Sequence, residues 1–372
     1  MDLTVLTSLL HASMLSIATL GCLMFFTTPA YRGICLLLAL VSLAALFNVL
    51  EDQNISREFY LVSPIFVFGF GPALFLAARR LIVGPIGYRA LWHFLPMLIA
   101  LPFTEYTQVV IALGTVWRIA YALLTLQLIF GFNRQLATQR SDASEVSLAW
   151  LGWLVGVSAF FNAIDLLRLN FQIELGAQLN TAGYAAGSLI TLCILFLLAL
   201  MLNNRRAALE ALAGSLAEGS APRELATNSL KSPVAETRKT EESVEDYQSL
   251  FAILDREIRA QEWYCQPRLT LTQLSELSGI NTRDISRSIN LVGGASFNDY
   301  INELRIAHIK HSMHASPQTN LLDLALAAGF SSKATFNQSF RKATGKTPSE
   351  FRSLMRVEKV QNHDSSRSIS SD

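Results

Sequence analysis

The sequence predicts an all-α protein in which a polytopic bundle of seven transmembrane helices is followed by a soluble all-α domain with two helix-turn-helix motifs. Only 16% of the 372 residues are charged, whereas soluble proteins carry about 25%. The long uncharged runs all lie before Arg205, and the first lysine of the chain is Lys231. Beyond that point short helix signals follow one another, with no strand-like alternation of apolar and polar residues.

The predicted spans come from run length. A helix needs about 20 apolar residues to cross the hydrocarbon core of a bilayer. One run, Leu91–Thr104, is short and contains Pro96 and Pro102, so by itself it could be a re-entrant segment. Counting it, the predicted spans are Leu3–Phe26, Gly33–Leu50, Leu61–Ala78, Leu91–Thr104, Val109–Phe132, Leu148–Leu169 and Leu179–Leu202.

The loop arginines favour treating Leu91–Thr104 as a spanning segment, because arginines in short loops prefer the cytoplasmic side. With seven spans and the N-terminus outside, only Arg57 and Arg168 are external. Without the short run, everything after Leu202 would become external. We therefore expect the C-terminal domain to lie in the cytoplasm. The arginines on the cytoplasmic side are then Arg32, Arg79, Arg80, Arg89, Arg134, Arg140, Arg205 and Arg206.

Arg118 is the polar residue of most interest within the spans. A charge at the bilayer centre costs at least about 2.5 kcal/mol unless it is paired or hydrated. Asp165 and Glu105 are the nearest anions by predicted depth, and His93 and Asn162 could add hydrogen bonds. A structural Arg–Asp pair and a cationic anchor for a ligand are equally compatible with this pattern. The candidate ligand-binding residues are therefore Arg118, His93, Glu105 and Asp165.

The sequence gives no support for catalysis. It contains no His-Glu-x-x-His motif, no Gly-x-Ser-x-Gly motif and no Walker-type glycine loop. Its four cysteines lack the paired spacing of zinc or redox sites. We therefore expect that the protein is not an enzyme and uses no cofactor and no metal.

The junction after the last span predicts a tether. Leu209, Leu212 and Leu216 share one helical face, which would allow two copies to pair as a homodimer. The stretch Gly219–Glu242 is rich in Ser, Thr, Ala and Glu and reads as a flexible linker. The predicted parts are a membrane region at 1–206, a juxtamembrane helix and linker at 207–243, a helical domain at 244–356 and a disordered tail at 357–372.

Capping residues mark the helix starts of the helical domain. Thr270 with Gln273, and Thr347 with Glu350, have the spacing of capping boxes. The same logic predicts further starts at Asn281, Ser296 and Asn320.

Two helix pairs have helix-turn-helix spacing. In the first, Ser275 permits close approach, Gly279 allows the tight turn and Ile285 supplies the packed contact. The corresponding residues of the second pair are Ala325, Gly329 and Phe336. Two matches about fifty residues apart, joined by an amphipathic helix near 298–313, are much more specific than one.

Four runs of this domain together carry a family resemblance, and they cover most of residues 244–356. They are Leu269–Leu274, Phe297–Arg305, Gly329–Phe340 and Gly345–Arg352. With them the domain resembles the AraC/XylS family of transcription regulators. The layout of the whole chain also resembles the membrane-bound members with seven N-terminal spans.

The resemblance implies a one-component transcription regulator in the bacterial inner membrane, with its N-terminus outside. Its spans would sense a small molecule or a membrane signal, and the second helix of each motif would enter the major groove of double-stranded DNA. Carried over by position, Arg283, Ser286 and Arg287 would face base edges from the first recognition helix, and Ala334, Asn337 and Gln338 from the second. The residues expected mainly on phosphates are Ser332, Lys333, Arg341 and Lys342.

Two departures from the family pattern shift the expected base readout to the first motif. Gln338 stands where many relatives have arginine, and Ala334 offers no hydrogen bond. Arginine can grip guanine bidentately, which favours Arg283 and Arg287. Residues 244–357 carry thirteen basic and eleven acidic residues, so the placement of the basic groups must matter more than their number.

One alternative from another class stays open. It is a receptor-like or transporter-like membrane protein whose helical domain binds a protein partner, and it would depend on Arg118 and the proline-broken fourth span. The sequence leaves open which signal is sensed, which promoter is bound, and whether transcription is activated or repressed.

Overall fold

The computed structural model describes residues 3–56, 60–207, 209–210 and 242–355. It divides into two compact units: residues 1–132 with 148–231, and residues 133–147 with 232–372. Within the described residues all regular structure is helical, and one isolated β-bridge joins Arg140 to Thr270. The all-α prediction is therefore confirmed. The predicted linker, tail, Leu212 and Leu216 lie outside the described residues.

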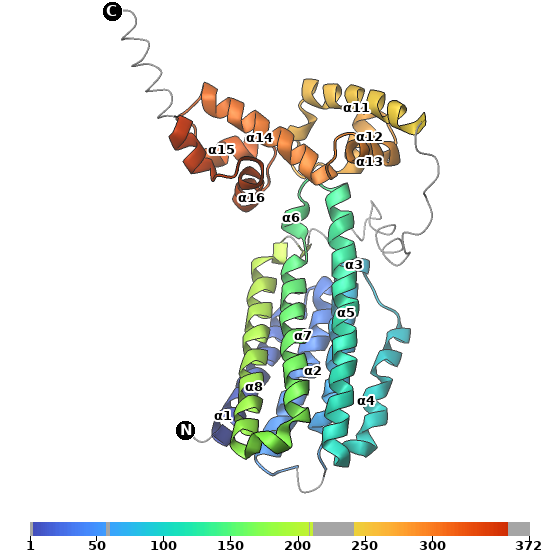
Figure 1. Cartoon of the computed structure of the whole chain (residues 1–372), viewed down its shortest axis with the longest axis vertical. Coiled ribbons are helices and arrows are strands. Elements are labelled where there is room, and N and C mark those ends of the chain that lie inside the picture. Colours follow the sequence, from blue (N-terminus) through green and yellow to red (C-terminus); the bar gives the residue numbers. More distant parts are fainter. Residues whose placement is uncertain (1–2, 57–59, 208, 211–241, 356–372) are drawn as a thin grey trace, which may run out of the picture. The chain divides into compact units, whose positions relative to one another are not determined.

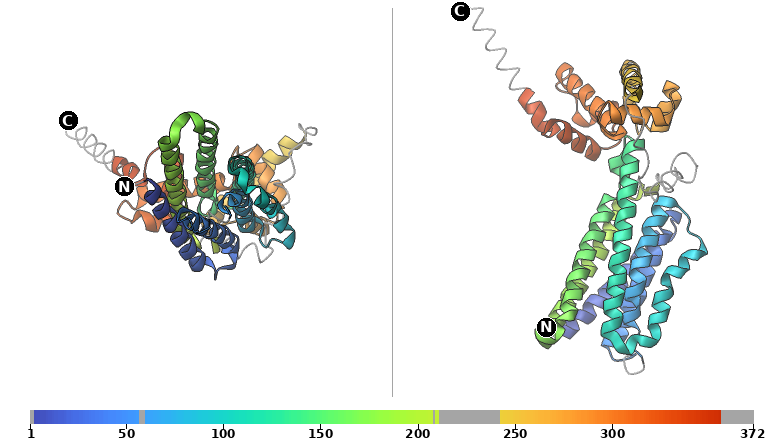
Figure 2. Two further views of the ribbon diagram at one scale, coloured as in Figure 1. Left: turned by 90° about the horizontal axis from the view of Figure 1, so that it is seen from below. Right: turned by 45° about the vertical axis from the view of Figure 1, so that its right-hand side comes forward.

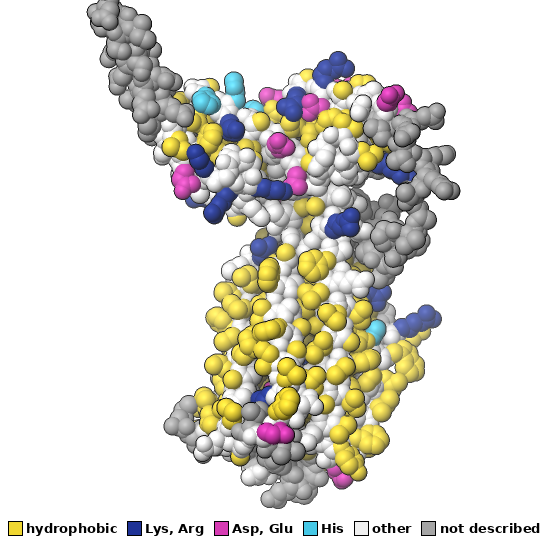
Figure 3. Space-filling view, in the orientation of Figure 1, with side chains coloured by type: hydrophobic (Ala, Val, Ile, Leu, Met, Phe, Trp, Pro, Cys, Tyr) yellow, Lys and Arg dark blue, Asp and Glu magenta, His cyan; other side chains and the backbone are white. Residues whose placement is uncertain are grey.

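Long apolar helices build the first unit and lie side by side in Figures 1 and 2. Six stretches are long and apolar enough to cross a membrane. Their outer faces carry large hydrophobic side chains (Figure 3), as Leu23, Phe130 and Trp153 do, which suits contact with lipid. The long helices are α1 (Leu3–Phe25), α2 (Arg32–Asp52), α3 (Phe66–Val83), α5 (Thr107–Gln139), α7 (Ala149–Asn170) and α8 (Gln172–Asn204).

The prediction of seven spanning helices is wrong, because six stretches meet the length and composition required, and one of them, Tyr88–Gln139, includes both the predicted fourth span and the predicted fifth. The region of the predicted fourth span is divided into η3 (Tyr88–Phe94), α4 (Leu95–Ala100) and η4 (Leu101–Tyr106). Pro96 and Pro102 occupy the first turns of α4 and η4. Each proline thus lies in a first turn, where its missing N–H leaves no intrahelical hydrogen bond unmade.

The broken segment nevertheless runs back along the bundle. Tyr88 follows the end of α3, whereas Tyr60, which precedes the start of α3, donates a hydrogen bond to the Leu101 carbonyl. Residues 88–101 therefore lead from the end of α3 towards its start, and α5 begins at that second end of the bundle.

A buried histidine links three helices of the first unit. His11 of α1 is 2% exposed, and its Nδ1 lies 2.9 Å from Oδ2 of Asp52 at the end of α2. Its Nε2 lies 3.4 Å from the hydroxyls of Tyr184 and Ser188 in α8. Polar contacts of this kind fix the relative rotation of helices in an apolar bundle.

The second unit consists of short helices that begin where their caps predict. Thr270 and Gln273 form the predicted capping box. Asn281 and Ser296 accept backbone hydrogen bonds three residues on, whereas Asn320 accepts from Leu322 instead. The helices are α11 (Glu242–Ala260), η5 (Trp263–Cys265), α12 (Leu271–Ser278), α13 (Thr282–Leu291), α14 (Phe297–Ala315), α15 (Leu321–Ala327), α16 (Lys333–Thr344) and a helical stretch at 348–355.

Two hydrophobic cores share helix α14. Its first half supplies Tyr300, Ile301 and Leu304 to a core formed with α11, α12 and α13. Its second half supplies Ile306 and Ile309, with other residues, to a core formed with α15 and α16. The helix therefore joins two helix-turn-helix subdomains, each with its own apolar centre.

Arg305 lies on α14 where one core gives way to the other, and it is 1% exposed. Its Nε donates to the Tyr264 carbonyl at 2.7 Å, and one terminal nitrogen donates to the Gln266 carbonyl at 2.8 Å. Its guanidinium also lies 5.5 Å from the ring centroid of Phe330, in the second subdomain. Burial lowers the pKa of Arg305 to about 10, so the side chain stays charged near neutral pH.

Substitution Arg305→Ala should destabilise the second unit by about 3 kcal/mol, because buried carbonyl acceptors would lose their donors and a cavity would form. Hydrogen exchange of the α12–α16 amides in the purified full-length protein measures this loss. Arg256→Ala, an exposed arginine on α11, should change exchange by less than about 0.5 kcal/mol. Equal effects of the two substitutions would contradict the role given to Arg305.

Two glycines of the second unit allow the cost of backbone strain to be distinguished from the cost of a steric clash. Gly329 and Gly345 both have positive φ angles, of 91° and 72°. A Cβ atom at Gly329 would lie 2.6 Å from the Cys265 carbonyl oxygen, whereas one at Gly345 would meet open space. Gly345→Ala should therefore cost about 1 kcal/mol of backbone strain, and Gly329→Ala about 1–3 kcal/mol more. Thermal unfolding of the two variants tests this difference, which similar losses would refute.

Candidate nucleic-acid interface

The first helix-turn-helix comprises α12 and α13. Gly279 ends α12 with a φ of 71°, a left-handed conformation that glycine adopts without strain. Ser275 Oγ donates to the Ile280 carbonyl at 2.5 Å and so holds the turn against α12. Ile285 and Ile289 are fully buried, which fixes the rotation of α13.

That rotation sets the accessibility of the predicted base-reading residues of α13. Arg283 is exposed, and Ser286 and Arg287 are half-buried. Asp284, in the first turn of α13, accepts hydrogen bonds from its own cap, Asn281, and from Tyr247 of α11 at 3.2 Å. The carboxylate is therefore engaged by neighbours within the domain.

The second helix-turn-helix comprises α15 and α16. Gly329 turns the chain, and Phe330 is 2% exposed in the core beneath it. Ser332, which the sequence analysis expects on phosphate, caps α16 by accepting from the Thr335 amide at 3.2 Å. Phe336 and Phe340 face the core, so the opposite side of α16 faces solvent.

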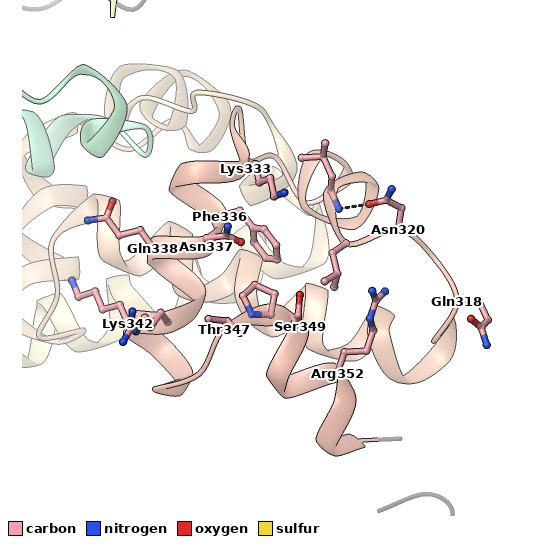
Figure 4. Close-up of a pocket in the computed structure, with 14 residues that line it drawn as sticks. Gln318, Asn320, Lys333, Phe336, Asn337, Gln338, Lys342, Thr347, Ser349 and Arg352 are labelled. Carbon is pink, nitrogen blue, oxygen red and sulfur yellow. Dashed lines mark hydrogen bonds between the residues drawn. The ribbon is translucent and has the colours of Figure 1, made fainter. Parts of the chain in front are cut away.

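The solvent-facing side of α16 carries the predicted DNA-contacting residues. Lys333, Ala334, Asn337, Gln338, Arg341 and Lys342 are all exposed. Figure 4 shows Lys333, Asn337, Gln338 and Lys342 on α16, beside Thr347, Ser349 and Arg352 of the following residues. Together with other residues they line an open groove of about 1260 Å³. Apart from alanine, the exposed side chains of α16 are polar or basic, as contact with a phosphate backbone requires, whereas Leu321, Leu322 and Pro348 add apolar lining to the groove.

Local contacts hold two basic residues near this surface. Lys342 Nζ lies 2.5 Å from Asp299 Oδ1 at the start of α14, although Lys342 itself is 67% exposed. Arg352 donates to the Thr319 carbonyl at 2.8 Å. An exposed pair contributes little to stability, so Lys342 can exchange Asp299 for a phosphate at small cost.

The structure adds contacts that sequence reasoning missed. The chain between α5 and α7 packs against α14 and α16, where Ser141 is fully buried and Asp142 is 3% exposed. Ser141 contacts α14, and Glu145, in α6 (Ala143–Val146), contacts the start of α16. No motif in this stretch indicated these contacts; the sequence signal available was its polar composition between two long apolar runs.

Three of the four candidate ligand-binding residues bond residues outside the candidate set. Arg118 of α5 donates to the Asn162 side chain of α7. Asp165 pairs with Arg168 at 2.8 Å instead. His93 Nδ1 lies 2.6 Å from the Tyr121 hydroxyl, and Glu105 is exposed. A direct Arg118–Asp165 salt bridge is therefore not present among the described residues.

Comparisons with known proteins match the C-terminal helices. A family model described as a helix-turn-helix domain matches residues 274–353. An uncharacterised HTH-type transcriptional regulator of Staphylococcus aureus (strain COL) is 34% identical over 84 residues, which cover 23% of this chain and 11% of that protein. The HTH-type transcriptional regulator GlxA of Rhizobium meliloti is 28% identical over 107 residues, covering 29% of this chain and 32% of that protein.

This chain thus spans about a tenth of the length of the staphylococcal relative and about a third of the rhizobial one. No solved structure matches the chain. The likeness to regulators agrees with the prediction of a non-enzymatic protein. The C-terminal part of the chain is therefore similar to the helix-turn-helix domains of transcriptional regulators.

Proposed function

We propose that the protein is a membrane-bound one-component transcription regulator that binds double-stranded DNA through both helix-turn-helix motifs. The observation that carries the proposal is the exposed polar and basic side of α16, opposite Phe336 and Phe340, in a domain that follows six span-length apolar helices. The likeness to transcriptional regulators favours this function over a receptor or transporter whose helical domain binds a protein.

Within this proposal the two recognition helices divide the work. Arg283, Ser286 and Arg287 read base edges from α13, and Asn337 and Gln338 add contacts from α16. Ala334 contributes only apolar contact. The residues that position the domain on phosphates are Ser332, Lys333, Arg341 and Lys342. The homodimer remains a prediction, which tethering to one membrane would favour through effective concentration.

The basic end of the first unit supports an orientation in the bacterial inner membrane. Arg80, at the end of α3, donates to the Pro29 carbonyl at 3.3 Å, and Arg206, after α8, donates to Thr28 Oγ1 at 3.2 Å. The ends of α3 and α8 therefore lie at one end of the bundle. Its arginines include Arg32, Arg79, Arg80, Arg205 and Arg206. We propose that this end faces the cytoplasm, so that the start of α1 faces outside.

Within this proposal, Arg118 is the residue that contacts the signal molecule. Its Nε is buried with no hydrogen-bond partner among the described residues, while its terminal nitrogen bonds Asn162. A buried cationic group with an unused donor suits an anionic or carbonyl-bearing small molecule. His93 bonds Tyr121, Asp165 pairs with Arg168 and Glu105 is exposed, so we assign these three residues no shared site.

Binding selection on a random pool of duplexes tests sequence-specific recognition by the full-length protein. A preferred sequence should emerge, and its footprint should cover two successive major grooves. A pool without enrichment would refute the proposed function.

Paired substitutions test the division of roles. Arg287→Ala should relax base preference at one position and cost about 1–3 kcal/mol against the preferred duplex. Lys342→Ala should weaken preferred and unrelated duplexes alike and lower the salt dependence of binding. Affinity measurements on a panel of single-base variants at two salt concentrations separate the two patterns. Matching effects of both substitutions would contradict the assigned roles.

Reporter fusions test the orientation. Alkaline phosphatase, which is active only outside the cytoplasm, should be active when inserted after Asn54, between α2 and α3. It should be inactive after Pro85, beyond α3. Green fluorescent protein fused after residue 372 should fluoresce, as it does in the cytoplasm. The reverse pattern of activities would overturn the proposed topology.

A further inference from the structure

The chain between α5 and α7 forms part of the same compact unit as the DNA-binding helices. Its residues 140–146, here called the connecting segment, precede α7 directly in the sequence. Arg140 and Asp142 form a bidentate pair, with nitrogen–oxygen distances of 2.8 and 2.9 Å. Ala143 and Val146 are 6% and 4% exposed. The connecting segment is thus ordered and buried in the second unit.

Ser141 docks the segment on the linker helix α14. Its amide donates to the Leu269 carbonyl at 3.0 Å. Its carbonyl accepts from the side chains of Asn298 at 2.8 Å and Asn302 at 3.1 Å. Its hydroxyl accepts from Arg305 at 3.2 Å. Every polar group of Ser141 is therefore bonded to the DNA-binding domain.

Glu145 reaches the start of the second recognition helix. Its Oε1 accepts from Ser331 Oγ and from Thr335 Oγ1, both at 2.9 Å. Thr335 is 4% exposed and lies in the first turn of α16, whose cap is Ser332. The carboxylate thus lies at the N-terminal end of α16, where two hydroxyl donors and the helix dipole favour an anion.

We propose that the connecting segment is an autoinhibitory ligand of the DNA-binding domain, with Glu145 standing in for a DNA phosphate. A carboxylate and a phosphate are both anions that accept hydrogen bonds from hydroxyl and amide donors. Glu145 and a backbone phosphate therefore compete for the N-terminal end of α16, and the negative carboxylate also repels the approaching DNA backbone. This inference rests on the proposed function, since it requires that α16 faces DNA.

The segment also gives the membrane region a route to the DNA-binding domain. It continues into α7 on one side and follows α5 on the other. A change in the first unit that pulls on either helix is transmitted along the backbone to Ser141 and Glu145. Release of Glu145 would expose the donors of α16, and DNA binding in turn would favour the released state.

The first experiment compares Glu145→Gln with Glu303→Gln in the full-length protein in lipid nanodiscs. Glu303 is exposed on α14, so its substitution removes the same charge from the same unit without touching Ser331 or Thr335. The probe is the duplex selected by the wild-type protein. Glu145→Gln should tighten its binding on the order of five- to tenfold, and Glu303→Gln by less than about twofold. Equal gains would show a general charge effect and would overturn the proposal.

The second experiment follows the segment itself by hydrogen exchange of residues 140–147. In the wild-type protein these amides should be protected, and adding the selected duplex should raise their exchange. Unchanged or greater protection of these amides with bound duplex would overturn the proposal. Weaker duplex binding by a folded Glu145→Gln variant would overturn it as well. If thermal unfolding shows that Glu145→Gln is unfolded, the exchange measured in the wild-type protein is the test of the proposal. Failure to select any duplex would refute the proposed function instead.

Discussion

A single buried cation holds the DNA-binding domain together. Arg305 has a guanidinium with donors in a fixed plane, and its partners come from different parts of the unit: Tyr264 and Gln266 before α12, Asn302 on its own helix, and Ser141 of the connecting segment. A buried charge is costly unless its donors are satisfied. These contacts are therefore interdependent, because the loss of one leaves a charged donor without its acceptor.

The contacts of Arg305 help to fix the positions of the two recognition helices, α13 and α16. Arg305 lies over the ring of Phe330, and Gly329 brings the second turn within contact of the Cys265 carbonyl. The second subdomain thus packs directly on the loop that precedes α12. Two helix-turn-helix units that share α14 and this junction present α13 and α16 as parts of one body. That is the arrangement that contact with successive grooves requires.

Features that depend on residues close together in the sequence were the most predictable. The helix starts at Thr270, Asn281 and Ser296 were predictable, because a cap acts on amides two or three residues away. The fourth span was predictable only in part. Loop charges indicate where the chain emerges from the membrane, but they do not report whether the segment between is one helix, and the structure divides it into η3, α4 and η4.

Contacts between distant residues could not be read in the same way. Depth along a span suggested Asp165 as the partner of Arg118, but the rotation of α7 places Asn162 against it and leaves Asp165 with Arg168. The exposed side of α16 was predictable, since Phe336 and Phe340 define the buried side by their spacing. The docking of Ser141 and Glu145 depends on a surface that exists only after α14 and α16 have packed.

The distribution of carboxylates explains why a nearly neutral domain can still be controlled electrostatically. Asp284 occupies the first turn of α13, but its partners Asn281 and Tyr247 belong to the same subdomain, so this anion is a permanent part of the helix. Glu145 occupies the start of α16, but it belongs to a segment that continues into the membrane helices. A carboxylate acts on a neighbouring anion according to their separation and the local dielectric, and not according to the net charge of the domain, so a single group beside the proposed phosphate position can matter there. Under the proposed autoinhibition, moving Glu145 would change the affinity of α16 for an anion without disturbing the residues of either hydrophobic core.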